Sequence, residues 1–286
     1  MGLLDSILKI NVEEMKAKRD LPALFGALGN KRNVYLRRDA ARALGELGDT
    51  AAIEPLVAAL KDPKREVRDA AAEAIGNLGG DPRAVEVVAA NLKSNRSLER
   101  DEAASALGKI RHKAGIEYLL PALKDQDCFV RQAAATSLGQ IGGSEVIEGL
   151  SQALKDEDKD VRGAAVSALG EIGSDTAVAL LTQSLRDESA IVRYRVVEAL
   201  GKIGGQAAVD ALVAALKDGG WISLQTGKAN QPGKKVWVRQ KAIEVLAQIG
   251  DARAVGPITE ALNDKQEPVR HAAQRALERL GSGTAG

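Results

Sequence analysis

The sequence contains very few aromatic side chains. Two Phe, two Trp and three Tyr amount to 2% of its 286 residues, so the core must be built from Ala, Leu, Ile and Val. Such a core suits closely packed helices better than a β-sandwich. The single cysteine, Cys128, excludes an internal disulfide framework and a zinc cluster built on cysteines. These absences favour an all-α protein in a reducing compartment.

Long apolar runs and an excess of charge of one sign are absent too. No stretch of eighteen apolar residues occurs, and the first residues lack the pattern of a secretory signal. Because 40 Lys and Arg are balanced by 39 Asp and Glu, the formal net charge is +1 and no global field attracts nucleic acid. The sequence therefore predicts a cytoplasmic protein with no membrane span and no nucleic-acid partner.

One motif repeats along most of the chain at a nearly constant spacing. Segments such as EVRDAAAEAIGNLG and DVRGAAVSALGEIG share one frame, which is anchored on an arginine. Six of the seven intervals between successive anchors span thirty-one or thirty-two positions, and the interval from Arg193 to Arg239 carries fifteen extra positions. A fixed period of roughly thirty residues is the signature of a repeat architecture. The eight anchors are Arg37, Arg68, Arg100, Arg131, Arg162, Arg193, Arg239 and Arg270.

Each repeat contains two amphipathic segments. Before the anchor, residues such as Ile53, Leu56, Val57 and Leu60 follow the i, i+3, i+4, i+7 stripe of a helix, which we name helix A. After the anchor, apolar residues at positions +3, +6, +7 and +10 define helix B. Such a pair is too small to bury its own faces, so pairs must stack into an all-α superhelical solenoid of about eight helix hairpins. Glycines predicted to end the B helices are Gly48, Gly79, Gly142, Gly173, Gly204, Gly250 and Gly281.

We expect one repeat domain over residues 1–281 and a flexible tail over residues 282–286. The extra residues fall in the seventh repeat, where an insertion at 219–236 separates helix A from helix B. In the last repeat, Gln274 and Glu278 occupy positions that are apolar or glycine in most of the others. These polar residues predict an end of the array that is exposed to water.

An aspartate precedes the anchor arginine by six residues in five repeats. It closes helix A and lies just before helix B, so its carboxylate can accept hydrogen bonds from the first amides of helix B and from the guanidinium of its own repeat. In the third repeat Ser94 replaces the acid, and in the seventh the insertion lies between Asp218 and the anchor. We expect a structural ladder formed by the eight arginines together with Asp62, Asp125, Asp156, Asp187, Asp218 and Asp264.

The insertion has a composition of its own. The segments WISLQT and KVWV are rich in β-formers, and the turn-forming stretch GKANQPGK separates them, which predicts a small β-hairpin. Lys228, Lys234 and Lys235 give it positive charge. Trp221 and Trp237 either anchor the hairpin to its own repeats or offer aromatic contact area to a partner.

The recurring pattern D-x5-VR-x-AAA-x-ALG-x-IG resembles the HEAT-like repeats of the phycobilisome lyase type, over residues 21–281. The resemblance implies a right-handed α-α superhelix whose B helices line the concave side. It also implies one of two functions, a protein-interaction scaffold or a bilin lyase subunit, because the family includes both. HEAT-like repeats also build deoxyhypusine hydroxylase, whose di-iron site uses His-Glu pairs. Here Lys113 follows His112 and Ala272 follows His271, so that metal site is not expected.

No pattern of catalytic residues is evident. The segment TGKA at 226–229 is not a phosphate-binding loop, because Ile222 stands where a glycine is required and Ala229 where Ser or Thr is required. Two histidines leave few options for a Ser-His-acid set. We expect no enzyme activity, no metal and no cofactor.

The face of the B helices is the candidate binding surface. Residues at positions +1, +5 and +9 after each anchor stack on one helix face, and their charges are mixed. This disfavours a DNA groove and favours a protein or peptide partner, while a merely solvated face explains any single residue equally well. Candidate binding residues, with the two tryptophans, are Arg38, Arg42, Gln132, Thr136, Gln140, Tyr194, Arg195, Trp221, Trp237 and His271.

The predicted function is a non-enzymatic scaffold that binds a protein or peptide on this concave face. The alternative is a phycocyanobilin lyase or another chromophore-handling subunit, which rests on the resemblance alone.

Overall fold

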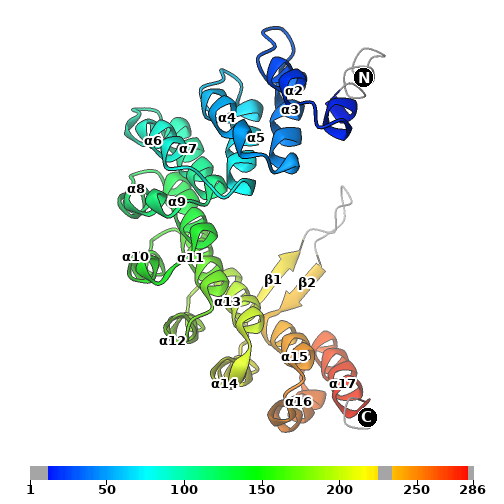
Figure 1. Cartoon of the computed structure of the whole chain (residues 1–286). Coiled ribbons are helices and arrows are strands. Elements are labelled where there is room, and N and C mark those ends of the chain that lie inside the picture. The colour runs from blue at the N-terminus through cyan, green and yellow to red at the C-terminus, as the bar shows by residue number, and fades with distance from the viewer. Residues whose placement is uncertain (1–11, 225–233, 283–286) are drawn as a thin grey trace. The chain divides into compact units, whose positions relative to one another are not determined.

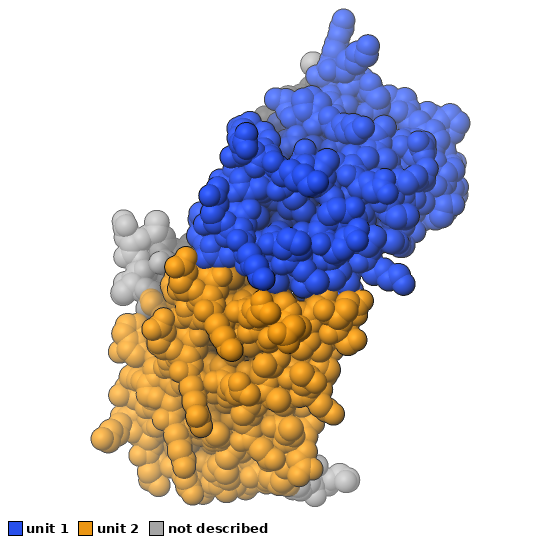
Figure 2. Space-filling view, turned by 90° about the vertical axis from the view of Figure 1, so that its left-hand side faces the viewer, with its two compact units in different colours: residues 1–142 blue, residues 143–286 orange. Residues whose placement is uncertain are grey.

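Two compact units make up the chain, Met1–Gly142 and Gly143–Gly286 (Figure 2). The computed structural model describes residues 12–224 and 234–282. Each unit holds four successive pairs of helices A and B, and we number these pairs repeats 1 to 8 in chain order. The middle of the predicted insertion, with Lys228, and most of the predicted tail lie outside the described residues.

The first unit alternates A and B helices after a helical segment at residues 12–17. Its B helices contact one another in chain order and form one layer, with the A helices beside them (Figure 1). The A helices are α2 (Leu21–Leu28), α4 (Ile53–Ala59), α6 (Pro82–Ala89) and α8 (Ile116–Ala122). The B helices are α3 (Val34–Leu47), α5 (Arg65–Asn77), α7 (Ser97–Ile110) and α9 (Cys128–Ile141). Short 3₁₀ turns adjoin the A helices at η1 (Thr50–Ala52), η2 (Ala90–Lys93) and η3 (Lys113–Gly115).

The second unit follows the same plan and also contains the two strands. Its A helices are α10 (Ile147–Ala153), α12 (Asp175–Ser184), α14 (Gly205–Ala215) and α16 (Val255–Glu260). The B helices are α11 (Lys159–Ile172), α13 (Ala190–Ile203), α15 (Val238–Ile249) and α17 (Glu267–Ser282). The 3₁₀ turns are η4 (Ser144–Val146), η5 (Ala252–Ala254) and η6 (Ala261–Asn263), and the strands are β1 (Trp221–Leu224) and β2 (Lys234–Trp237).

One large apolar side chain per helix forms the centre of each unit. Burying such a side chain contributes about 1.5–3 kcal/mol, and the alanines around it let neighbouring helices approach closely. The prediction of an all-α solenoid of helix pairs is confirmed. At position +7 of the B helices the fully buried residues are Leu44, Ile75, Leu107, Leu138, Leu169, Leu200 and Leu246. Their counterparts in the A helices are Leu24, Leu56, Leu119, Leu150, Leu181, Leu212 and Ile258.

Most B helices end at a glycine with a left-handed backbone, as the sequence predicts. Gly48 has φ 72° and Gly250 has φ 80°, a conformation that glycine adopts without steric cost. In repeat 3 a non-glycine residue, Arg111, takes this role with φ 54°. The prediction for Gly281 is wrong, because α17 continues through that residue to Ser282.

The predicted β-hairpin is present, but the residues that pack against the repeats are not the ones that one interpretation of the sequence predicted. Ile222 pairs with Val236, and these are the buried residues of the hairpin, 9% and 6% exposed. Strand β1 contacts α13 and β2 contacts α15, so this pair fixes the hairpin to its repeats. Trp221 pairs with Trp237 but stays 47% exposed. The interpretation that both tryptophans anchor the hairpin is therefore wrong for Trp221, because alternate residues of a strand point to opposite faces.

Candidate functional site

Anchor arginines join successive repeats within each unit. In five of them, Nε and Nη2 donate to the two carboxylate oxygens of an aspartate 25 residues later, in the following repeat. In the most buried of these pairs, Arg162 and Asp187, the two distances are 2.8 and 3.0 Å, and the side chains are 8% and 9% exposed. We call each such pair a rung. The five rungs are Arg37–Asp62, Arg100–Asp125, Arg162–Asp187, Arg193–Asp218 and Arg239–Asp264.

For the five aspartates of the rungs, the predicted pairing of the carboxylate with the arginine of the same repeat is wrong. Asp62 accepts from Arg37 through its carboxylate, whereas Arg68 donates from Nη1 to the backbone carbonyl of Asp62, at 2.9 Å. The carboxylate also accepts from the amide of Lys64, which holds the side chain toward the preceding repeat. The aspartate thus turns its carbonyl to its own repeat and its carboxylate to the previous one.

The insertion in repeat 7 leaves this scheme intact. Arg239 donates to the carbonyl of Asp218 at 2.9 Å although the whole insertion separates them in sequence, and the Asp218 carboxylate accepts from Arg193. Gly220 donates its amide to the same carboxylate at 2.6 Å. The hairpin therefore starts from a loop that the arginines already hold in place.

The rungs predict loss of stability in acid. Hydrogen bonds from Arg100 and Arg239 hold the pKa values of Asp125 and Asp264 below their usual range. A carboxylate whose pKa is lower in the folded than in the unfolded state stabilises the fold fully above its unfolded pKa, about 3.9, and the contribution is lost as the pH falls through the folded pKa. Urea unfolding between pH 7 and pH 3 should therefore show a free energy that decreases below about pH 5. The decrease should be smaller in Arg100→Met, and equal slopes in both proteins would contradict this origin.

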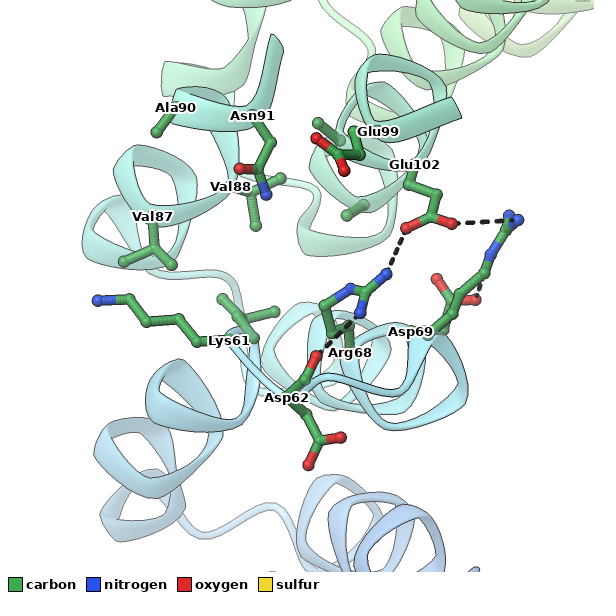
Figure 3. A pocket seen from close by; sticks show the side chains of 14 residues that line it. Lys61, Asp62, Arg68, Asp69, Val87, Val88, Ala90, Asn91, Glu99 and Glu102 are labelled. Atoms are coloured by element: carbon green, nitrogen blue, oxygen red, sulfur yellow. Dashed lines mark hydrogen bonds and ion pairs between the residues drawn. The ribbon is translucent and has the colours of Figure 1, made fainter. Parts of the chain in front are cut away.

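Arg68 is the exception to the ladder. Ser94 stands where six other repeats carry the acid, and Arg68 instead donates from Nη2 to Glu102 of α7 (Figure 3). Arg65 lies 3.6 Å from the second oxygen of Glu102 and 3.4 Å from Asp69. Figure 3 shows the carboxylate of Asp62 pointing away from Arg68, toward the preceding repeat. The rung between repeats 2 and 3 therefore lacks its aspartate.

A pocket of about 530 Å³ opens at this missing rung (Figure 3). Helices α5 and α7 approach closely at their C-terminal ends. The approach is so close that a Cβ atom on Gly76 would lie 2.0 Å from the carbonyl oxygen of Lys109. At their N-terminal ends Arg68 and Glu102 line the pocket. Its other walls come from the end of α4, from α6 and from η2: they include Leu60, Lys61, Val87, Val88, Ala90 and Asn91.

Part of the predicted binding surface, the face with positions +1, +5 and +9 of the B helices, lines a second pocket, of about 320 Å³, between α7 and α9. Gln132, Thr136 and Gln140 of α9 line it together with Asp101 and other polar residues of α7. Burial raises the pKa of Asp101 above its ordinary value. The structure therefore brings Gln132, Thr136 and Gln140 together in one hollow with hydrogen-bonding groups along its walls.

An exposed aromatic residue at the edge of this pocket was missed by the sequence reasoning. Phe129 also lines the pocket and is 67% exposed. It lies two positions before its anchor, and Tyr35, Leu98 and Ile191 occupy the same position in other repeats, all of them exposed. A comparison of position −2 across the repeats could have found this set, since large apolar side chains recur at that position.

The other candidate residues lie outside this pocket. Arg38 pairs with Asp39 and lies 5.3 Å from the Tyr35 ring, and Arg42 is exposed on the same helix. In the second unit, burial raises the pKa of Tyr194, and the adjacent Arg195 packs against Gly163.

At the C-terminal end, His271 is exposed and lies 3.8 Å from Glu267. In the hairpin, Lys235 lies 3.8 Å from the Trp221 ring and 4.9 Å from the Trp237 ring. The candidates therefore fall into separate groups rather than one site.

Residues 12–224 and 234–282 contain no cluster of three or more His, Cys, Asp or Glu side chains arranged to hold a metal ion. Within the same ranges, no helix combines the length and apolar character that crossing a membrane requires.

A family model described as HEAT repeats matches residues 21–106, 92–155, 147–223 and 233–285. A stretch of 44 residues is 50% identical to phycocyanobilin lyase subunit alpha of Picosynechococcus sp., which is 15% of this chain and 16% of that protein. The chain thus matches only a small part of that relative's length. The predicted resemblance to HEAT-like repeats of the phycobilisome lyase type is confirmed.

Two solved structures share the fold over most of the chain. A structure of Kap95p with RanGDP matches with TM-score 0.60 and 15% identity, over 95% of this chain and 42% of that chain. A crystal structure of importin beta matches with TM-score 0.57 and 14% identity, over 95% of this chain and 43% of that one. The family model matches most of the chain, and the described residues form the helix pairs and repeated core positions that this model implies, so the chain belongs to the family of HEAT-repeat proteins.

Proposed function

We propose that this protein is a non-enzymatic scaffold that binds a protein or peptide on the face of its B helices, with the pocket between α7 and α9 as the central contact. The observation that carries the proposal is the combination of an exposed Phe129 with a neutral, hydrogen-bonding hollow. Aromatic side chains at the centre of a contact supply much of the binding energy of interfaces. Gln132, Thr136 and Gln140 offer donors and acceptors that a polypeptide backbone can use.

The neutral character of the pocket supports a polypeptide over a nucleic acid. Lys109 lies at its rim but is paired with Asp69 of α5, and Asp101 contributes an acid. A phosphate backbone requires clustered cations that are free to bind it. A peptide needs instead a few directed hydrogen bonds beside an apolar anchor, which is the composition found here.

Site-specific photo-crosslinking tests the proposal. A photoreactive phenylalanine analogue at Phe129, introduced into the protein in its native cells, should crosslink to a protein that mass spectrometry identifies. The same analogue at Glu117, an exposed residue on α8 of the same repeat, is the matched control and should not capture that protein. Equal capture at both positions would count against this face.

Affinity measurements then define the contact. With the captured protein purified, the triple variant Phe129→Ala, Gln132→Ala, Thr136→Ala should bind at least about thirtyfold more weakly, since loss of a hot spot costs about 2 kcal/mol or more. All three side chains are at least partly exposed, so the thermal midpoint of unfolding should stay near that of the wild type. Unchanged affinity would overturn the proposed role of this pocket.

A second candidate function is a chromophore-handling subunit, such as a bilin lyase subunit. The match of 44 residues at 50% identity to a phycocyanobilin lyase subunit supports it. Adding phycocyanobilin to the purified protein tests it, because a bilin held in a protein pocket changes its visible absorption. An unchanged spectrum at concentrations well above that of the protein would argue against this function.

A further inference from the structure

We propose that the pocket at the missing rung is a binding site for an aliphatic carboxylate, which takes the place of the aspartate that repeat 3 lacks. This site is separate from the pocket between α7 and α9, and the inference does not rest on the proposed function. Its ligand is identified by chemistry: a carboxylate on a short apolar stem.

Arg68 has one unused donor, its Nε–H, on the edge that holds the carboxylate in a complete rung. In the five complete rungs, the Nε and Nη2 edge of the arginine holds both oxygens of a carboxylate, at distances between 2.5 and 3.1 Å. Arg68 uses Nη1 for the Asp62 carbonyl and Nη2 for one oxygen of Glu102, and its Nε meets no acceptor among the described residues. A planar guanidinium with a free Nε–H favours bidentate binding of a carboxylate.

The loop around Ser94 keeps the geometry of a complete rung. Its backbone angles are φ −65° and ψ 145°, and those of Asp264 are φ −62° and ψ 146°. The Ser94 hydroxyl accepts from the amide of Arg96, as the Asp264 carboxylate accepts from the amide of Gln266. Ser94 also accepts from Arg100 through its carbonyl, at 3.0 Å. The junction therefore lacks a carboxylate and retains the frame that would position one.

The charges around the pocket favour an anion. Three of the four acids in its lining have cationic partners outside it: Asp62 pairs with Arg37, Asp69 with Lys109, and Glu99 with Arg96. The fourth acid, Glu102, contacts Arg65 and Arg68. Lys61 has no ion pair among the described residues. The lining alone carries three cations, Lys61, Arg65 and Arg68, and four acids. With the outside partners Arg37, Lys109 and Arg96, six cations face the four acids, so the acids are neutralised and an excess of two positive charges remains.

The remaining walls are mostly apolar and favour a ligand whose carboxylate is attached to an apolar chain. Leu60, Val87, Val88, Ala90, Ala103 and Ala106 are apolar, and Asn91 adds one amide. A short aliphatic chain ending in a carboxylate satisfies both parts of this lining. Such a group is present in the side chain of Glu on a bound polypeptide and in a free small acid.

NMR of arginine side chains tests the site on the full-length protein. In ¹H–¹⁵N spectra, the Nε resonance of Arg68, assigned by its loss in Arg68→Lys, should shift saturably on titration with glutarate. Ser94→Asp is expected to fill the pocket with its own carboxylate and to weaken glutarate binding at least about tenfold, the effect of one charge-assisted pair. Ser94→Ala, which adds no acid, is the matched control and should bind as the wild type does.

A second titration distinguishes the two sources of the group. If acetyl-Ala-Glu-Ala-amide shifts the same resonance at least as strongly as glutarate, the site takes a side chain of a polypeptide; if glutarate alone does, it takes a free acid. Lys61→Gln, on the pocket wall, should weaken either ligand about threefold. The inference is overturned if neither probe gives a saturable shift of Arg68, or if Ser94→Asp binds glutarate as tightly as the wild type.

Discussion

Replacing Asp187 with alanine is expected to lower the free energy of unfolding by about 3–5 kcal/mol, because it leaves a buried guanidinium without its acid. The Arg162 side chain is 8% exposed, and both oxygens of Asp187 accept from it. Glu188 also contacts Arg162, at 3.2 Å, but its side chain is 86% exposed and cannot replace the buried pair. The substitution removes an acceptor from the amide of Ser189 as well. Urea unfolding followed by circular dichroism measures the loss.

Two further variants isolate the cause. Arg162→Met combined with Asp187→Leu removes both charges and should cost less than Asp187→Ala alone, since no unpaired ion remains in the interior. Glu171→Ala breaks an exposed pair with Lys202, in which both side chains are 55% exposed, and should cost less than about 1 kcal/mol. If Asp187→Ala is no less stable than the double variant, the loss of stability does not come from an unpaired buried guanidinium.

Gly76→Ala is expected to destabilise the protein by about 1–3 kcal/mol, although alanine favours helices over glycine by up to about 1 kcal/mol. Gly76 lies eight positions after its anchor, and a Cβ there would lie 2.0 Å from the Lys109 carbonyl oxygen. The obstacle is backbone of α7, which no change of side-chain rotamer removes. Helices α5 and α7 would have to separate, which would expose the core around Ile75.

Gly26→Ala is the matched control for this prediction. Gly26 also lies within a helix, α2, but a Cβ there would meet no atom within 4 Å. Its replacement should raise the free energy of unfolding by about 0.5–1 kcal/mol. The two substitutions make the same chemical change, so opposite signs would show that packing between B helices decides the effect at Gly76. Equal stabilisation by both would contradict the close approach of α5 and α7.

The candidate site was only partly predictable. Gln132, Thr136 and Gln140 were identified because positions +1, +5 and +9 share one face of a helix, and this face lines a pocket. Phe129 was missed, because it precedes the anchor by two positions and the pattern was followed only from the anchor onward, although the same face of α9 continues back to Phe129. The pocket at Arg68 also depends on atoms from five separate elements, and no local sequence pattern contains the distances between them.

The sequence by itself determined the repeat, the two helices of each repeat and their buried positions. Hydrophobic periodicity within a helix is a local property of the sequence. Because the anchors are evenly spaced, the same apolar positions can be recognised in each repeat. Residues such as Leu107 and Leu138 could therefore be placed in the core without any knowledge of the neighbouring repeats.

Only the tertiary structure decided which arginine each aspartate binds. Because the spacing is regular, an aspartate such as Asp62 stands at a fixed separation both from the anchor of its own repeat, Arg68, and from the previous anchor, Arg37, so the sequence contains both pairings equally. The choice depends on the direction of the side chain as it leaves the loop, and the amide two positions later fixes that direction toward the preceding repeat. Because of the same geometry, the serine at position 94 removes the contact that an aspartate would make with Arg68 of the preceding repeat. The Nε of Arg68 is therefore available for a ligand.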